Sequence, residues 1–203
     1  MRACLALLAA ALVRASAPST WFASTTIAGT AGTSGAANGA PRAALFSAPY
    51  GLAGDFSATR TDPSSLPLLY VADTGNHCLR SVALAAGAVT TAAGTCGTAG
   101  AADGAAPLFN GPRALALNAG LLVVADTANH CVRAVTVVSG AATTPAGTCG
   151  GSPGYADGAG AAALFASPAG VAVDAASLTA YVGDPGNLRV RAVTPGGVVT
   201  TLA

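Results

Sequence analysis

The stretch "VADTGNHCLR" at Val71–Arg80 returns almost letter for letter as "VADTANHCVR" at Val124–Arg133. A looser third version, "YVGDPGNLRVR", occupies Tyr181–Arg191. Each version has an apolar run that ends in Asp, a short turn that contains Asn, and a second run that carries Arg. Recurrence of this kind indicates a structural unit that is used several times.

The composition favours an all-β chain. The 203 residues include no Lys, Glu or Gln, three types that keep exposed helix faces soluble. Ala is abundant, but it is mixed with Gly, Thr, Val and Pro, which suit turns and short strands. The 9 Arg and 8 Asp nearly balance, so the sequence favours no nucleic-acid partner. No apolar run reaches the ~20 residues that a membrane-spanning helix needs.

The N-terminal residues 1–17, "MRACLALLAAALVRASA", have a basic start, an apolar stretch and small residues at positions 15–17. This layout predicts a secretory signal peptide, followed by a short linker at 18–24. We therefore expect a secreted, extracellular protein. A packed N-terminal helix and a short anchor are the alternatives.

Each repeat along residues 25–203 carries four short extended segments, and "LFxxP" lies in the connection between repeats. "TTIAGT", "TTAAGTCG", "TTPAGTCG" and "VTTLA" are versions of one of them, and "LFxxP" occurs three times. Short apolar runs ("GLAGD", "ALALN", "GVAVD") follow each "LFxxP", and the Asp-Asn-Arg stretch comes next. Four antiparallel strands per repeat of about 40–50 residues make a β-propeller blade.

These stretches, with the preceding "DG…LF..P" segments, resemble the NHL-repeat β-propellers. The resemblance implies an NHL-type β-propeller with three four-stranded blades, at about 31–95, 96–148 and 149–203. Thr25–Thr30 is predicted to form a leading outer strand. Closed propellers typically need four to eight blades. We therefore expect a partial propeller, which a second copy could complete as a six-bladed homodimer, or a fragment of a longer propeller protein.

Four cysteines follow the predicted signal peptide: Cys78, Cys96, Cys131 and Cys149. Each within-repeat pair is centred on a glycine, Gly87 or Gly140, at which a hairpin could turn. Such a hairpin would place the two cysteines of a repeat opposite each other, near the distance that a disulfide needs. We predict the pairs Cys78–Cys96 and Cys131–Cys149. A zinc site that combines Cys with His is the alternative, but adjacent residues on a strand point to opposite faces.

The remaining polar residues of the repeat have structural and functional interpretations. Asp73, Asp126 and Asp184 are predicted to shape turns by accepting backbone N–H groups two residues ahead, with calcium binding as the alternative. The recurring arginines, with Arg191 in the third repeat, either pair with Asp or bind an anionic ligand. His77, Arg80, His130 and Arg133 are the candidate binding residues.

The predicted function is a secreted, non-catalytic module that binds or scaffolds a protein or glycan ligand. A lyase- or lactonase-like propeller enzyme is the alternative. The innermost strands supply only Asp55, Asn118 and Asp174 as candidate catalytic groups, and these fall at strand ends. We therefore expect no catalytic residue, metal or cofactor.

Overall fold

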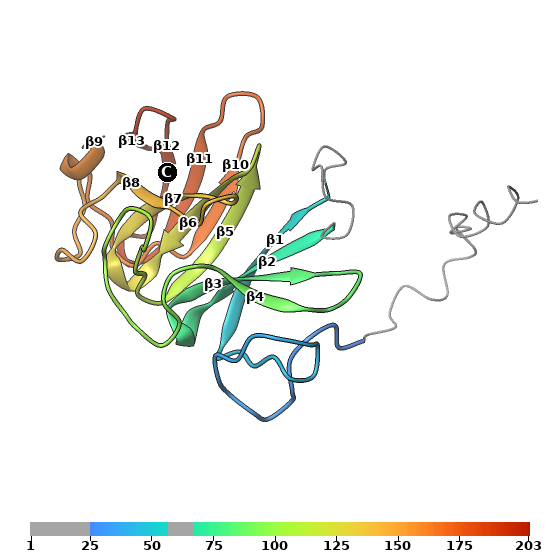
Figure 1. The fold of residues 1–203 in the computed structure, drawn as a ribbon. Helices are drawn as coiled ribbons and strands as arrows, with labels where there is room; N and C mark the ends of the chain where they lie inside the picture. Colours follow the sequence, from blue (N-terminus) through green and yellow to red (C-terminus); the bar gives the residue numbers. More distant parts are fainter. Residues whose placement is uncertain (1–24, 57–66) are drawn as a thin grey trace, which may run out of the picture.

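The computed structural model describes residues 25–56 and 67–203; the predicted signal peptide and linker lie outside them. The chain forms three antiparallel sheets that follow one another in sequence (Figure 1). The first sheet comprises β1 (Pro49–Asp55), β2 (Leu68–Asp73), β3 (Cys78–Ala83) and β4 (Val89–Ala93). The second comprises β5 (Pro112–Asn118), β6 (Leu121–Asp126), β7 (Cys131–Thr136) and β8 (Ala142–Ala146). The third comprises β10 (Gly170–Val173), β11 (Ala180–Asp184), β12 (Arg189–Val193) and β13 (Val198–Thr201), with the short β9 (Gly158–Ala159) beside β13.

The four main strands of each sheet lie in chain order, as the repeat pattern predicts for a propeller blade; β9 alone departs from this order, at the outer edge of the third sheet. The helical elements among the described residues are single 3₁₀ turns. They are η2 (Thr74–Asn76), η3 (Thr127–Asn129), η4 (Gly160–Ala162) and η5 (Pro185–Asn187). The all-β fold is therefore confirmed. In residues 25–56 and 67–203, no helix has the length and apolar character to cross a membrane.

Among the described residues, two of the three hydrophobic clusters lie between neighbouring blades, and the third covers the outer face of the first blade. Tyr70 and Leu79 of the first blade pack with Leu122 and Val124 of the second. A second cluster joins Val132 to the third blade. Phe109 and Phe165, from the "LFxxP" connections, are fully buried in these two clusters and fill the space between neighbouring blades.

The first strands of the three blades, β1, β5 and β10, are neighbours and form the inner edge of the row. Gly51 in β1 shows how closely they approach. A Cβ at this position would collide with the backbone carbonyl of Arg113 in β5. Glycine therefore allows the first two blades to meet at the inner edge.

The predicted leading strand is wrong. Thr25–Thr30 forms no strand. A fourth strand needs a third strand to pair with, and no described residue supplies one beside this segment. Instead, the Gly29 N–H donates to the Pro41 carbonyl (2.7 Å), and Ala28 packs on the outer face of the first blade.

Candidate functional site

The repeated stretch folds the same way in each blade. The second strand ends at Asp, one 3₁₀ turn carries Asn, and the next residue takes the left-handed conformation before the third strand begins. That next residue is His77, His130 or Leu188, each with φ of 56°. The conformation costs energy for any residue except glycine. Its recurrence in all three blades means that the surrounding contacts hold the turn.

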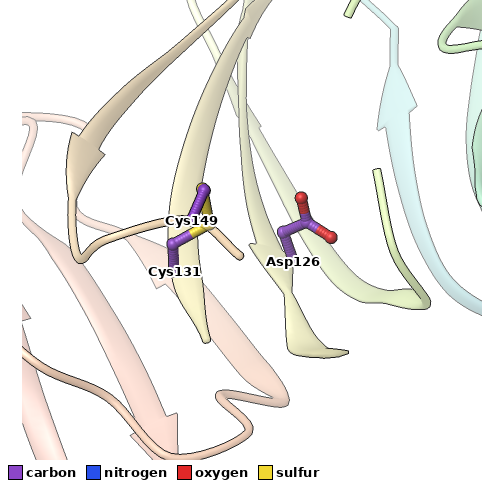
Figure 2. Close-up of side chains that lie close together, drawn as sticks. All are labelled: Asp126, Cys131 and Cys149. Atoms are coloured by element: carbon purple, nitrogen blue, oxygen red, sulfur yellow. A yellow bond between two sulfur atoms is a disulfide. The ribbon is translucent and has the colours of Figure 1, made fainter. Parts of the chain in front are cut away.

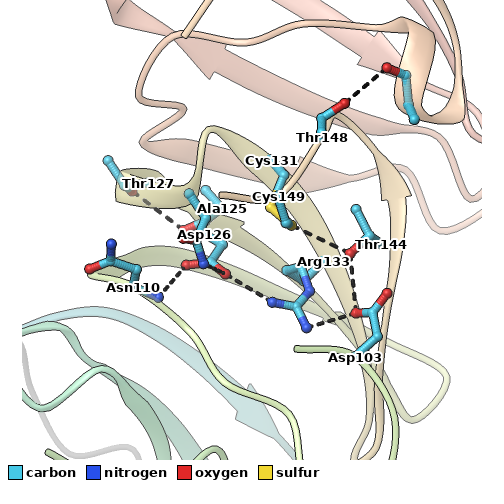
Figure 3. Close-up of a disulfide and its surroundings, with 12 residues drawn as sticks. Asp103, Asn110, Ala125, Asp126, Thr127, Cys131, Arg133, Thr144, Thr148 and Cys149 are labelled. Atoms are coloured by element: carbon cyan, nitrogen blue, oxygen red, sulfur yellow. Dashed lines mark hydrogen bonds and ion pairs between the residues drawn. A yellow bond between two sulfur atoms is a disulfide. The ribbon is translucent and has the colours of Figure 1, made fainter. Parts of the chain in front are cut away.

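The Asp of each repeat lies at the centre of a buried network. In the second blade, Asp126 accepts hydrogen bonds from the Asn110 N–H (2.8 Å), Asn129 Nδ2 (2.8 Å) and Arg133 NH1 (3.0 Å) (Figure 3). Burial is the largest effect on Asp126 and raises its pKa above the ordinary value for Asp. These hydrogen bonds and the positive charge of Arg133 act in the opposite direction but do not cancel it. The carboxylate thus ties the "LFxxP" connection to the turn and to the third strand.

This arrangement corrects the predicted role of Asp73, Asp126 and Asp184. None of the three caps its own 3₁₀ turn with its side chain. The backbone N–H groups that they accept belong to Ser47, Asn110 and Ala166, far back along the chain. An Asp that accepts backbone N–H groups two and three residues ahead occurs instead at Asp174, whose carboxylate accepts those of Ala176 and Ser177. Hydrogen bonds from Ser177 and Ala176 lower the pKa of Asp174.

The arginines are equally enclosed. Arg133 has no exposed surface, and it donates to Asp126, to Asp103 Oδ1 (2.7 Å) and to the carbonyls of Leu108 (2.9 Å) and Ala102 (2.7 Å). Its guanidinium carbon lies 5.0 Å from the centre of the Phe109 ring. Arg80 and Arg191 repeat this pattern in the other blades.

Arg80 and Arg133 were predicted as binding residues, and their complete burial makes that prediction wrong. Pairing with Asp, the structural alternative, is the arrangement found. The outer partner in the second and third blades is Asp103 or Asp157, whereas Asn38 takes this position in the first. Burial raises the pKa of Asp157, but hydrogen bonds from Arg191 and Thr201 outweigh it and lower the pKa overall.

The two histidines connect each blade to the next. His77 Nδ1 accepts the Gly111 N–H (3.0 Å), and His130 Nδ1 accepts the Ser167 N–H (3.0 Å). Thr74 and Thr127 support these contacts by donating to the carbonyls of Pro112 and Pro168. Both imidazoles are half-buried. The two histidines thus have a structural role, in which each accepts a hydrogen bond from the next blade. That they also bind a ligand stays a prediction.

Both predicted disulfides are confirmed. Cys78 bonds to Cys96, and Cys131 bonds to Cys149, with Cα atoms 5.0 and 5.1 Å apart. The prediction that the two cysteines of a pair face each other on adjacent strands is wrong, because only the first cysteine of each pair lies in a strand. The fourth strands end at Ala93 and Ala146, so Cys96 and Cys149 lie in the connections that follow. Each disulfide therefore joins the start of a third strand to the segment that leaves the blade.

One group of potential metal ligands lies beside the second disulfide. Asp126, Cys131 and Cys149 place their ligand atoms within 4.8 Å of one another (Figure 2). Zinc binds cysteine as the thiolate, and these two sulfur atoms are bonded to each other. The Asp126 oxygens are already occupied by three donors. These residues therefore do not fit a metal ion.

The inner edge carries two residues that the sequence-based search missed. Tyr50 in β1 is 68% exposed, and Arg113 in β5 is exposed beside it, with 5.6 Å between the guanidinium carbon and the ring centre. Both follow the Pro of "LFxxP" directly. The inner strands begin at Pro49 and Pro112, earlier than the predicted "GLAGD" and "ALALN" runs. Beginning the strands at Pro would have revealed the pair.

The two ends of the row expose apolar side chains whose equivalents are buried between blades. Leu52 of β1 is 58% exposed, whereas Leu115, at the matching position of β5, is 5% exposed. At the other end Val190 is 43% exposed, while its equivalents Leu79 and Val132 are fully buried. The third blade also has Pro185 and Leu188 where the others have Thr and His, so it lacks both interblade hydrogen bonds.

Comparisons with known proteins agree with this architecture. Residues 109–134 match the NHL repeat. An auxiliary nutrient binding protein from Bacteroides thetaiotaomicron gives a TM-score of 0.52 at 22% identity, over 66% of this chain and 35% of that one. A chain of a nidogen/laminin complex gives 0.53 at 14% identity, over 76% and 48%. A streptogramin B lyase gives 0.50 at 11% identity, over 77% and 40%. No curated protein matches the chain.

The chain spans between a third and a half of the length of these solved structures. At such low identities the likeness concerns the fold alone. The matched repeat covers all of β5, β6 and η3 and the first part of β7, which are the elements that hold the Asp126 network. The chain therefore carries an NHL repeat at residues 109–134 and is built from blades of the β-propeller fold.

Proposed function

We propose that the chain is a secreted, non-catalytic binding module that holds an acidic glycan at its inner edge. The exposed pair Tyr50 and Arg113 carries this proposal. An exposed aromatic ring offers a flat apolar surface to the C–H face of a sugar. A guanidinium beside it offers paired N–H donors to a carboxylate.

The proposal of a non-catalytic role rests on how the polar residues of the repeat are used. Asp126 accepts from Asn129 and Arg133, and the Asn129 amide and both terminal nitrogens of Arg133 also donate to backbone carbonyls. A general base needs a free lone pair facing a substrate. The inner-strand Asp174 is held by its own turn, which leaves the Tyr50–Arg113 surface suited to recognition rather than reaction.

A glycan array with neutral and uronate-containing sugars tests this function. We expect the protein to retain uronate-containing sugars selectively, and Tyr50→Ala and Arg113→Ala each to abolish the retention. Arg189→Ala is the matched control, because Arg189 is an exposed arginine on another strand. Retention that survives both inner-edge substitutions would refute the site. Retention of acidic peptides instead of sugars would replace the glycan by a protein ligand.

A second copy of the chain completes the ring in this proposal. The exposed faces around Leu52 and Val190 have the apolar character of the faces that join the blades. Contact between the two ends would bury both kinds of face in a closed set of six blades. Sedimentation velocity is expected to give a dimer, and Leu52→Arg to give a monomer. A wild-type monomer, or a dimer lost equally with Val138→Arg on an exposed hairpin, would contradict ring closure.

Secretion is the part of the proposal that concerns residues 1–17. The two disulfides support it, because such bonds persist in oxidising compartments. Mass spectrometry of protein collected from a culture medium is expected to find an N-terminus at Pro18. Recovery of the protein in the cell fraction with Met1 retained would overturn this part.

A further inference from the structure

A cavity of about 320 Å³ lies between the second and third blades. Its walls are formed mainly by apolar side chains: Leu121, Val123, Val132, Leu178, Ala180 and Val193. Ala119, Leu178 and Pro195 border it, and each belongs to a hairpin turn. These hairpin turns lie at one end of the strands, and the Asp-Asn-His turns lie at the other end. The cavity is therefore separate from the inner-edge surface of Tyr50 and Arg113.

The cavity results from particular side chains and not from the geometry of a blade joint. Between the first two blades, the position of Val123 is occupied by Tyr70 and that of Val132 by Leu79. The position of Ala180 is occupied by Leu122. All three larger residues are buried and packed together. Smaller residues at these three positions leave room between the second and third blades.

The chemistry of the walls restricts what could bind. No residue that lines the cavity carries a charge, and the polar side chains are those of Asn118 and Thr194. Asn118 Nδ2 is buried and has no hydrogen-bond partner among the described residues. A buried amide donor without a partner is costly, and native structures contain few of them. A ligand with an acceptor within reach of this amide would supply the missing hydrogen bond.

The mouth of the cavity carries a strained residue. Leu178 has φ of 58° and is 50% exposed. A turn position of this kind favours Gly or Asn, because a bulky side chain is strained there. The Asp174 carboxylate holds the turn through Ala176 and Ser177. A leucine kept in this conformation, beside the exposed Leu121, gives the mouth an apolar rim.

We propose that this cavity binds a neutral, compact hydrophobic molecule that carries one hydrogen-bond acceptor, such as a cyclic ketone or ether. Its volume lies at the lower end of the range for small-molecule sites, about 300–1,000 Å³. Anions and polar sugars are unsuited, because the walls offer no positive charge and few hydrogen-bonding groups. This proposal does not depend on the proposed glycan function.

A fluorescence titration with N-phenyl-1-naphthylamine, a neutral apolar dye, tests the proposal. The dye is expected to saturate at one site per chain. Camphor is expected to displace it about tenfold more effectively than bornane, the hydrocarbon of the same shape, because camphor has a carbonyl acceptor. Asn118→Ala is expected to remove the advantage of camphor. Absence of saturable dye binding would overturn the proposal.

Two cavity-filling variants locate the site. Val123→Tyr and Ala180→Leu place at these positions the residues that the joint between the first two blades already uses. Each is expected to weaken dye binding about tenfold or more. Val138→Ala is the control, because Val138 is 85% exposed on a hairpin and does not line the cavity. Far-UV circular dichroism and thermal unfolding check that each variant is folded. Two folded filling variants that bind the dye as tightly as the wild type would refute the site.

Discussion

Arg133→Met tests whether the buried network holds the blade together. The substitution removes the guanidinium but keeps an unbranched side chain that can still pack on Phe109. Asp126, which has no exposed surface, then lacks its charged partner. The carbonyls of Leu108 and Ala102 lose their donors as well.

The expected cost follows from these contacts. Removal of one partner of a buried ion pair costs about 3–5 kcal/mol. Each carbonyl adds about 1 kcal/mol. The contact with Asp103, whose side chain is 45% exposed, adds no more than about 1 kcal/mol. We expect a loss of about 5–8 kcal/mol in the free energy of unfolding, a large part of the total of about 5–15 kcal/mol for a small domain.

The loss should depend on pH, because Asp126 can bind a proton in the variant. Burial already raises the pKa of this carboxyl, and without Arg133 the pKa rises further. A group whose pKa is higher in the folded state favours folding at low pH, and this stabilisation is lost as pH rises through the folded value. The variant is therefore expected to lose less stability at about pH 5 than at about pH 8.

Urea unfolding followed by circular dichroism measures these differences. Arg113→Met is the matched control, because it removes an exposed guanidinium and should cost less than about 1 kcal/mol. Arg133→Lys, which keeps the charge but not the planar fork, should fall between the two. Equal stabilities for Arg133→Met and Arg113→Met would refute the structural role assigned to the network.

Three further perturbations follow from the same structure. The double substitution of Cys131 and Cys149 by Ser should lower the free energy of unfolding, measured in urea, by about 3 kcal/mol, as expected for a closed loop of this size. Reduction of the wild type breaks both disulfides, so its loss should exceed that of the double variant only by the contribution of Cys78–Cys96. Gly51→Ala should lower the melting temperature, because its Cβ would meet the Arg113 backbone, whereas Gly54→Ala would meet only the exposed ring of Phe56 and should change it little. Asp157→Asn should reduce stability near neutral pH. This difference from the wild type should shrink as pH falls below about 4, because a lowered pKa stabilises the fold fully above the pKa of the unfolded chain and the effect is lost as pH falls through the folded pKa.

The features that could be predicted from the sequence are those set by regular spacing. The recurrence of the Asp-Asn-Arg stretch predicts three four-stranded blades, and the equal separation of the cysteines predicts both disulfides; the structure contains all of them. The missed features depend on contacts distant in sequence. Asp126 accepts the N–H of Asn110 across the blade, and nothing local distinguishes this from a turn contact. For the same reason Thr25–Thr30, which looks like a fourth strand, forms none without a third strand beside it.

The candidate sites lie where the repeats differ, and this follows from the physics of the blade. Positions that are alike in the three repeats, such as Asp126 and Arg133, satisfy buried groups, and a change at any of them is costly. Their presence therefore identifies a blade and carries no information about a ligand. Val123 stands where the first blade has the larger, buried Tyr70, and it lines the cavity between the second and third blades. At Arg113, which corresponds to Tyr50, the exposed inner edge was free to acquire charge. If substitutions at these variable positions leave all binding intact, the differences between the repeats reflect drift, and the function lies outside the described blades.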